Sequence, residues 1–216
     1  MSFSIITTVL NNEKFINDCL KSVSKQNIKE NLEHIIVDGG STDNTLTIIK
    51  KFQKNNKYLK VFKKKKLGIY QGINFGIKKA KNRYIALLHS DDLYKNKKVL
   101  ENVLRIFNSH KNLLAIYSNV EIVRRNNKKK ILRIFKSKQL TSNDFLKCQH
   151  PPHTSLIIER SLFKKFGLYN SKLKIASDFE FMLRLFGKNK ISLKYINKTF
   201  IIMRSGGTST KSLKNI

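Results

Sequence analysis

Short apolar runs alternate with amphipathic segments through the first half of the chain. The runs at 4–9 and 33–38 are rich in β-branched residues and have the length of buried parallel strands. Between them, apolar residues recur at helical spacing from Phe15 to Val23. The alternation continues with a helix at 46–53, a strand at 59–63, a helix at 70–81, a strand at 84–89 and a helix at 97–107. This order predicts an α/β fold, with a mainly parallel sheet and crossover helices over roughly the first 110 residues.

The second half has a different pattern. Segments 113–125 and 129–136 are extended and flank the sequence NNKKK, which predicts a hairpin. Helical patterns follow near 162–166 and 178–186, and a last strand is expected at 192–203. Since the chain has no linker-like stretch and no internal repeat, we expect one domain over 1–216, in which residues 111–216 build onto the sheet of residues 1–110.

The charge of the chain is extreme. It carries 44 Lys and Arg against 14 Asp and Glu, a formal net charge of +30. One interpretation is a nucleic-acid or anionic-membrane partner. The other is a compositional bias, in which Lys, Asn and Ile are over-used together. Lys is spread along the whole chain and Arg is rare, which favours the bias, and no helix-turn-helix, zinc or RNA-binding motif is present. We therefore expect no specific nucleic-acid partner.

Cysteines and apolar runs indicate the compartment. Cys19 and Cys148 are far apart and have no metal-like spacing, so we expect neither a disulfide framework nor a zinc site. The first residues lack the basic leader and cleavage site of a signal peptide, and no apolar run approaches the ~20 residues that span a bilayer. These features predict a cytoplasmic protein.

Polar residues follow two of the predicted strands. In VDGGSTDNT, Asp38 ends a strand, and Gly39, Gly40 and Ser41 come before the next helix. Ligands of open parallel sheets bind at the carboxyl ends of strands, and glycines let a ligand approach the backbone closely. Asp38 could accept hydrogen bonds from a base or a ribose. The alternative is that these residues turn the chain and cap the helix.

Two adjacent carboxylates, Asp91 and Asp92, follow the strand at 84–89 in the sequence HSDD. Side by side and partly desolvated, they would repel each other unless a cation neutralised them. Oxygen ligands select Mg²⁺ or Mn²⁺, which usually bind one or two carboxylates together with the phosphates of a substrate. A helix N-cap is the alternative, and it explains one Asp better than two.

Three further motifs carry candidate chemistry. Asp178 and Glu180 precede the apolar face of a helix, where a carboxylate could act as general base or could simply cap the helix. The sequence HPPHTS holds His150 and His153, which suit a metal, a phosphate or a rigid turn. In GIYQGINFGI, a glycine every four residues lies along one helix face and would let that helix approach a strand or a ligand.

In this order, the motifs resemble those of the family 2 inverting glycosyltransferases, which have the glycosyltransferase A-type fold. The resemblance covers about residues 3–207 and rests on SIITTVLNNEKF, IIVDGGSTDNT and the SDD of the metal-binding DXD-type element. GIYQGINFGIKKAKNRYIALLHSDD and HTSLIIERSLFKKFGLYNSKLKIASDFEFMLRL are similar to the subgroup that builds colanic acid and related polysaccharides. The resemblance implies a Rossmann-like nucleotide-sugar-binding half at 1–110 and an acceptor-binding half at 111–216.

The resemblance also implies roles for single residues. It implies a nucleotide pocket formed by Thr8, Glu13, Asp38, Gly39, Ser41 and Asp91. Asp91 and Asp92 would hold Mn²⁺ or Mg²⁺ on the diphosphate of a UDP-, GDP- or dTDP-sugar. Asp178 would be the general base that deprotonates the acceptor hydroxyl. The candidates for acceptor or diphosphate contacts are Glu180, His153 and Arg204.

The family implies a saccharide or lipid-linked acceptor in surface polysaccharide synthesis. Polybasic segments at 63–66 and 128–130 could then bind anionic lipid at the inner face of the membrane. The subgroup commonly has acidic residues where this chain has Leu67 and Gln71, which leaves open a degenerate homologue that binds nucleotide sugar without turnover. A nucleotidyltransferase would need a basic, glycine-rich loop after the first strand, and TTVLNNE is not one.

Overall fold

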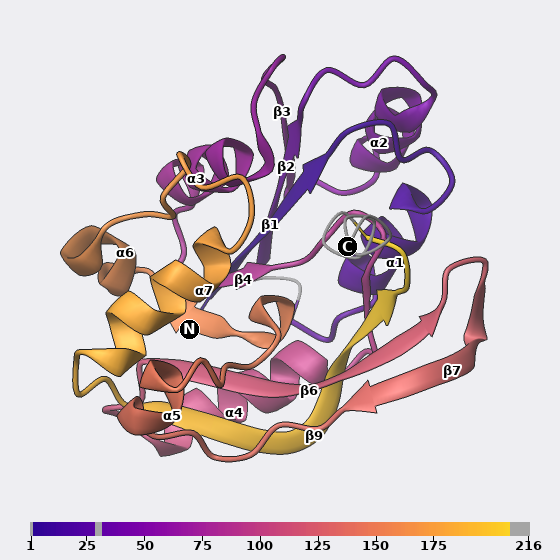
Figure 1. Ribbon diagram of the computed structural model, residues 1–216. Helices are drawn as coiled ribbons and strands as arrows, with labels where there is room; N and C mark the ends of the chain where they lie inside the picture. Colours follow the sequence, from indigo (N-terminus) through magenta and orange to yellow (C-terminus); the bar gives the residue numbers. More distant parts are fainter. Residues whose placement is uncertain (1, 29–31, 208–216) are drawn as a thin grey trace, which may run out of the picture.

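A sheet of nine strands with helices on both faces organises the protein (Figure 1). The structure, a computed structural model, describes residues 2–28 and 32–207. The strand order is β3-β2-β1-β4-β8-β6-β9-β5, and β7 pairs with β6 beside this path. No helix among the described residues is long and apolar enough to cross a membrane.

The first four strands form the parallel region of the sheet, as the sequence pattern predicted. They are β1 (Phe3–Val9), β2 (Leu32–Asp38), β3 (Leu59–Lys63) and β4 (Tyr84–Leu87), and every pairing among them is parallel. The helices of this half are α1 (Ile16–Ser24), α2 (Thr45–Gln53), α3 (Ile69–Lys79) and α4 (Val99–Ser109). Because parallel strands end at a common edge, the loops after β1, β2 and β4 meet there.

The second half makes the sheet mixed. Its strands are β5 (Leu93–Tyr94), β6 (Ala115–Arg124), β7 (Asn127–Phe135), β8 (Ile157–Glu159) and β9 (Leu193–Arg204). The short strand β8 lies antiparallel between β4 and β6, and β6 and β7 form the predicted hairpin. β9 runs parallel to β6, and β5 pairs antiparallel with β9. The pattern missed β5 and β8 because strands of two or three residues carry no periodicity.

The helices of the second half are short. They are α5 (Ser142–Leu146), the 3₁₀ turn η2 (His153–Ser155), α6 (Ser161–Phe166), α7 (Ser177–Met182) and the π-helical turn η3 (Leu183–Gly187). The helix expected at 178–186 is therefore α7 followed by η3. Of its apolar residues, Phe181, Met182, Leu185 and Phe186 are buried, and Leu183 is partly buried.

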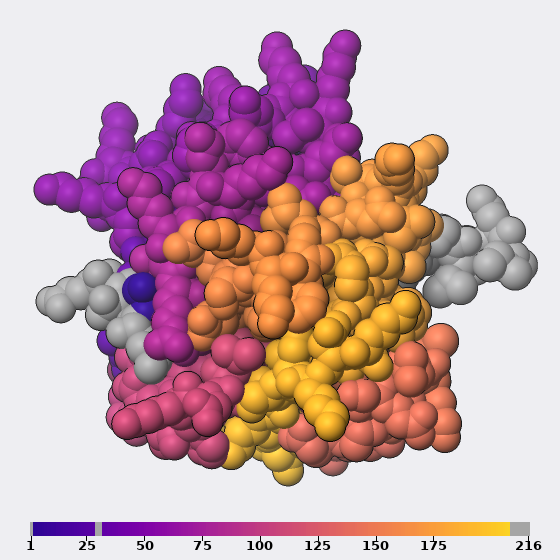
Figure 2. Space-filling view, turned by 90° about the vertical axis from the view of Figure 1, so that its left-hand side faces the viewer, coloured from indigo at the N-terminus to yellow at the C-terminus, as the bar shows by residue number. Residues whose placement is uncertain are grey.

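Two apolar cores lie on opposite faces of the sheet. One contains the buried residues of α1, α2 and α4, and the other those of α3, α5, α6 and α7. Alternation along β1 sends Ile5 into the first core and Ile6 into the second. Figure 2 shows the face with the second core, where orange residues of the α6–α7 region pack below the purple first half. The two halves of the chain thus share one sheet and both cores.

Glycines bring α3 against β1, as the sequence analysis expected. A Cβ at Gly76 would lie 2.5 Å from Cγ2 of Ile6, and a Cβ at Gly72 would lie 2.9 Å from Cγ2 of Thr8. Real Cβ atoms do not approach neighbours so closely. The two glycines therefore let the helix lie directly on the strand, and its N-terminus reaches the edge where the strand-end loops meet.

Candidate functional site

A cavity of about 410 Å³ opens at the carboxyl ends of the parallel strands. Its wall is built by residues from both halves of the chain. They are Thr8–Asn12, Val37, Gly39, Leu67–Ile69, Gly72, His89–Asp91, Arg125 and Gly206–Gly207. This is the place where an open α/β sheet binds its ligand. Thr8, Gly39 and Asp91, three of the residues predicted to bind nucleotide, line the cavity.

Asp38 supports the loop that forms one side of the cavity. Its side chain is fully buried, and its Oδ2 accepts hydrogen bonds from the backbone N–H groups of Gly40 at 3.0 Å and Ser41 at 3.1 Å. Gly40 has a φ of +104°, a conformation that favours glycine. In this structure Asp38 does not line the cavity. Its hydrogen bonds fix the turn that presents Gly39 to the cavity instead.

Glu13 and Ser41 join the loops that follow β1 and β2. Glu13 accepts a hydrogen bond from the backbone N–H of Asn44 at 2.8 Å, and the Ser41 hydroxyl accepts one from the backbone N–H of Asn11 at 3.0 Å. Neither side chain lines the cavity. Their predicted role in nucleotide binding stays a prediction, and the structure gives them contacts that hold the cavity wall together.

The adjacent carboxylates have different surroundings. Asp91 lines the cavity, and its Oδ2 lies 3.0 Å from Nη1 of Arg125, which also lines it. Asp92 is 1% exposed and does not line the cavity. Its Oδ1 accepts a hydrogen bond from the backbone N–H of Arg204 at 3.2 Å, and its Oδ2 has no partner. Burial, together with the charge of Asp91, raises the pKa of Asp92 well above its usual value.

Arg204 lies behind the cavity. Its guanidinium pairs with Asp18 and donates to the carbonyl of Arg125, and its side chain is 3% exposed. The Phe15 ring contacts both arginines, with the guanidinium of Arg125 4.8 Å and that of Arg204 4.7 Å from its centre. The predicted diphosphate contact of Arg204 therefore has no direct support from its position. Arg125 is the arginine that the fold brings to the cavity.

The side chains at the cavity wall include one ligand that suits a hard cation. Asp91 offers a carboxylate at the wall, and Mg²⁺ or Mn²⁺ can bind one carboxylate together with substrate phosphates. Among the described residues of the chain, no three His, Cys, Asp or Glu side chains are grouped as metal ligands. Asp92 would reach a cation only with its buried Oδ2. Asp91 is therefore the residue of the pair that is placed to hold a metal.

A further carboxylate, that of Asp178, lies near the cavity wall without lining it. It is in the first turn of α7, and Ala176, just before the helix, has a φ of +65°. Its Oδ2 lies 2.9 Å from Nδ1 of His153, and its Oδ1 accepts a hydrogen bond from the hydroxyl of Tyr70 at 3.0 Å. Burial raises the pKa of Asp178, but hydrogen bonds and the charge of His153 outweigh it and hold this pKa well below the usual value. Asp178 is therefore ionised at neutral pH.

His153 connects Asp178 to the cavity wall. Its Nε2 lies 2.9 Å from Nε2 of His89, and His89 lines the cavity next to Ser90 and Asp91. Burial, with a contribution from His153, lowers the pKa of His89 to about 4, so His89 is neutral at pH 7. The fold thus joins residues 70, 89, 153 and 178 in one hydrogen-bonded chain. The HPPH motif is conspicuous in the sequence, but this contact of His153 was not predicted.

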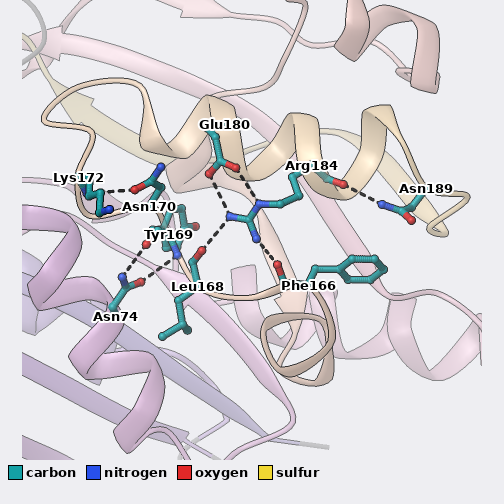
Figure 3. A network of polar contacts seen from close by, with 9 residues as sticks. All are labelled: Asn74, Phe166, Leu168, Tyr169, Asn170, Lys172, Glu180, Arg184 and Asn189. Atoms are coloured by element: carbon teal, nitrogen blue, oxygen red, sulfur yellow. Dashed lines mark hydrogen bonds and ion pairs between the residues drawn. The ribbon is translucent and has the colours of Figure 1, made fainter.

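Glu180, predicted to contact acceptor or diphosphate, is engaged in a structural network (Figure 3). Its two carboxylate oxygens pair with Nε of Arg184 at 2.8 Å and Nη2 at 3.0 Å. Arg184 also donates to the carbonyls of Phe166 and Leu168. Asn74 of α3 holds the next residue, Tyr169, through both backbone N–H and carbonyl. The network ties α7 to the segment after α6, and it ties both to α3. Each oxygen of the Glu180 carboxylate accepts a hydrogen bond within it.

Three residues of this site were not predicted from the sequence. His89 is the last residue of the strand expected at 84–89, so the rule that the carboxyl ends of parallel strands carry ligand contacts could have identified it. Tyr70 was noticed only as a member of a glycine-rich helix. Arg125 appeared only as the last residue of the extended segment 113–125. No local signal distinguishes it, because pairing along β6 and β9 places it beside Asp91.

Comparisons with known proteins agree with the fold. Residues 4–167 match the family model described as glycosyl transferase family 2. A PGL/p-HBAD biosynthesis glycosyltransferase of Mycobacterium bovis is 27% identical over 196 residues, which cover 90% of this chain and 73% of that protein. The colanic-acid subgroup stays a prediction.

Solved structures share the fold. S. aureus TarS 1-349 in complex with UDP-GlcNAc has a TM-score of 0.78 and 23% identity, and the match covers 96% of this chain and 59% of that one. The mannosyltransferase PcManGT from Pyrobaculum calidifontis, in complex with GDP-Man and Mn²⁺, has a TM-score of 0.70 and 15% identity. That match covers 98% of this chain and again 59% of the solved chain. The chain thus spans about three fifths of each of these structures.

Proposed function

The chain belongs to glycosyl transferase family 2, and from this premise we propose that it transfers a sugar from a nucleotide-diphosphate sugar to an acceptor hydroxyl, with inversion. The observation that carries the proposal is that two carboxylates, Asp91 and Asp178, are connected to the wall of one cavity. Asp91 is in the cavity wall, and Asp178 is linked to the same wall through His153 and His89. We assign the first carboxylate to the donor diphosphate and the second to the acceptor.

The donor would occupy the cavity. Thr8 and Gly39 line it beside Asp91, and Asp38 and Ser41 hold the loop behind Gly39. The structural neighbours bind UDP-GlcNAc and GDP-Man, which supports a nucleotide sugar as donor. UDP, GDP and dTDP sugars all remain candidates.

Asp91 would hold Mn²⁺ or Mg²⁺ beside the diphosphate. When bound, such an ion neutralises the charge that develops on the departing diphosphate. The Mn²⁺ in the PcManGT complex supports this assignment. Arg125, 3.0 Å from Asp91 and also in the wall, brings a permanent positive charge to the same place.

The transfer would occur in a single displacement. The oxygen of the acceptor hydroxyl forms a bond to the anomeric carbon, and its proton moves to the carboxylate of Asp178. The bond between the anomeric carbon and the diphosphate oxygen breaks, and the nucleoside diphosphate leaves with the electron pair. Asp178 can act as base because it is ionised at neutral pH.

The acceptor is proposed to be a saccharide or a lipid-linked saccharide of a surface polysaccharide or glycolipid. The mycobacterial relative acts in PGL/p-HBAD biosynthesis, which supports this class. Residues 63–66 and 128–130 are exposed, and the latter adjoin the exposed apolar side chains Ile131, Leu132 and Ile134 of β7. We propose that these segments bind an anionic membrane, at about 1 kcal/mol per Lys. Unchanged binding to phosphatidylglycerol vesicles after neutralising both segments would exclude this contact.

Calorimetry with UDP, GDP and dTDP, each with and without Mn²⁺, tests the donor site. We expect one nucleotide to bind with Mn²⁺, and we expect Asp91→Asn to remove the metal-dependent component. Glu101→Gln, on the distant helix α4, is the matched control and should bind as the wild type does. Nucleotide affinity that ignores both Mn²⁺ and Asp91→Asn would refute the metal–diphosphate assignment.

Turnover separates an enzyme from a degenerate homologue. The probe is release of nucleoside diphosphate from UDP-GlcNAc or GDP-mannose, with water as acceptor. We expect Asp178→Asn to lower this rate by about 10²- to 10⁴-fold, the usual contribution of a general base, while nucleotide binding persists. Nucleotide binding with no turnover by the wild type would favour the alternative, a non-catalytic nucleotide-sugar-binding homologue.

A further inference from the structure

The carboxylate of Asp178 accepts a hydrogen bond from the backbone of its own helix, at Phe179. It lies in the first turn of a helix of six residues, after a residue with positive φ. The residues just before this helix, 170–175, are exposed. An inverting displacement needs the base oriented toward the acceptor hydroxyl, and an error of 1 Å can cost about 10²-fold in rate. Contacts from outside α7 therefore add to this backbone hydrogen bond in holding the carboxylate.

His153 makes the contact that reaches across the site. Two prolines precede it in HPPH, and it begins the 3₁₀ turn η2. On one side its Nδ1 lies 2.9 Å from Oδ2 of Asp178, and on the other its Nε2 lies 2.9 Å from Nε2 of His89. The His89 ring meets it edge to face, with ring centres 4.9 Å apart and planes at 79°. His89 is fixed in the cavity wall two residues before Asp91.

The position of the proton on His153 follows from these contacts. An ionised carboxylate only accepts, so Nδ1 of His153 must carry a hydrogen and donate it to Asp178. This holds whether His153 is neutral or charged. If it is neutral, its Nε2 accepts a hydrogen bond from Nε2–H of His89, and if it is charged, it donates one. In both cases the ring is bound at both nitrogens and cannot turn away from Asp178.

We propose that His153 is a positioning residue that fixes the carboxylate of Asp178 relative to the donor cavity, by linking it through His89 to the loop that carries Asp91. The inference rests on the proposed function, in which Asp178 is the general base. His153 itself does not line the cavity, so it acts through Asp178. Tyr70 holds the other carboxylate oxygen from α3.

Two substitutions of His153 separate its contact with Asp178 from its contact with His89. His153→Asn keeps an amide N–H close to the position of Nδ1, and His153→Leu keeps bulk but no donor. His150→Asn is the matched control, because His150 lies in the same HPPH motif, while its Nδ1 contacts the carbonyl of Pro151 and its ring packs against Phe179 rather than Asp178. Asp178→Asn is measured alongside. The probe is release of nucleoside diphosphate from UDP-GlcNAc or GDP-mannose, whichever the wild type uses.

We expect His153→Leu to lower kcat by about 10²-fold with KM for the nucleotide sugar within about twofold. His153→Asn should recover to within about tenfold of the wild type, and His150→Asn should equal it. If Asp178→Asn is inactive while both His153 variants keep wild-type kcat, the positioning role is refuted and the proposed base stands. If Asp178→Asn keeps wild-type turnover, the proposed base itself is refuted. If His153→Asn is as inactive as Asp178→Asn, His153 takes the proton itself and is not a positioning residue.

A spectroscopic measurement tests the contact without any substrate. Long-range ¹H–¹⁵N correlation spectra of histidine side chains report which ring nitrogen carries the hydrogen, and the His153 signals are assigned by their loss in His153→Asn. We expect a hydrogen on Nδ1 of His153 in the wild type and a weakened preference for Nδ1 in Asp178→Asn. A hydrogen on Nε2 alone would show that the bond to Asp178 does not exist, and it would overturn the inference.

Discussion

The contact between α3 and β1 allows a quantitative prediction for Gly76→Ala. The added methyl would lie 2.5 Å from Cγ2 of Ile6 and 3.5 Å from its Cβ. Ile6 is 1% exposed and packs among the second core, so it has no open space to enter. Carbon atoms are in favourable contact at about 3.5–4.0 Å, so helix and strand would have to separate by about 1 Å.

Two opposing effects determine the free energy of unfolding of this variant. Overpacking a close-packed core costs about 1–3 kcal/mol, and the short distance to Ile6 places Gly76→Ala near the upper limit. Replacing Gly by Ala inside a helix contributes about 1 kcal/mol in the opposite direction. The net expectation is a loss of about 2 kcal/mol. With a urea m-value of about 2 kcal/mol/M, the unfolding midpoint would fall by about 1 M.

Urea unfolding followed by circular dichroism measures this loss. Gly68→Ala is the control, because it makes the same chemical change at the N-cap of the same helix, where a Cβ would meet only Oε1 of Gln71 at 3.8 Å. It should change stability by less than about 1 kcal/mol, because its main effect is that alanine is a poorer N-cap than glycine. In a double-mutant cycle, Ile6→Ala removes the clashing methyl and should recover some of the loss caused by Gly76→Ala. A Gly76→Ala variant as stable as the wild type, or a cycle without coupling, would refute the reasoning.

Three further variants test the site. Gly72→Ala places a methyl 2.9 Å from Cγ2 of Thr8 in the cavity wall and should weaken nucleotide binding about tenfold, or about 1.4 kcal/mol, by calorimetry. Burial raises the pKa of Asp92, so the native state binds a proton more tightly than the unfolded state. The free energy of unfolding should therefore fall as pH rises above about 4. Asp92→Asn should remove this slope and stabilise the protein at pH 7, and a urea midpoint at pH 7 below that of the wild type would contradict this. Arg125→Gln should tighten Mn²⁺ binding about 2- to 5-fold in the absence of nucleotide, because the partly exposed ion pair between Arg125 and Asp91 no longer competes with the metal. An unchanged Mn²⁺ affinity would contradict this expectation.

Local signals in the sequence were sufficient for the first half of the fold. Periodicity identified β1 to β4 and α1 to α4, because each is long enough to show a buried strand or an amphipathic face. The glycines of α3 predicted its close approach to a neighbour. The strand-end rule placed Gly39 and Asp91 near one edge of the sheet, the family resemblance added Thr8, and all three line the cavity.

The sequence could not assign the functional side chains to their final surroundings. Asp91 and Asp92 are neighbours in the chain, yet only Asp91 lines the cavity, since successive residues point in different directions. Arg204 was one of the candidates for contact with acceptor or diphosphate, but its side chain pairs with Asp18 behind the wall. Arg125 lies at the cavity instead.

By itself, the sequence determined the family motifs, the α/β alternation and the edge of the sheet where chemistry would be sought, because these features depend on residues close together in the chain. The tertiary structure alone decided the mixed order of the second half and the hydrogen-bonded chain from His89 through His153 to Asp178. Residues 89 and 153 come together because β8 pairs antiparallel with β4 and places the turn η2 beside the end of that strand. Pairing between strands so distant in sequence depends on how the whole sheet packs, and no local pattern encodes it.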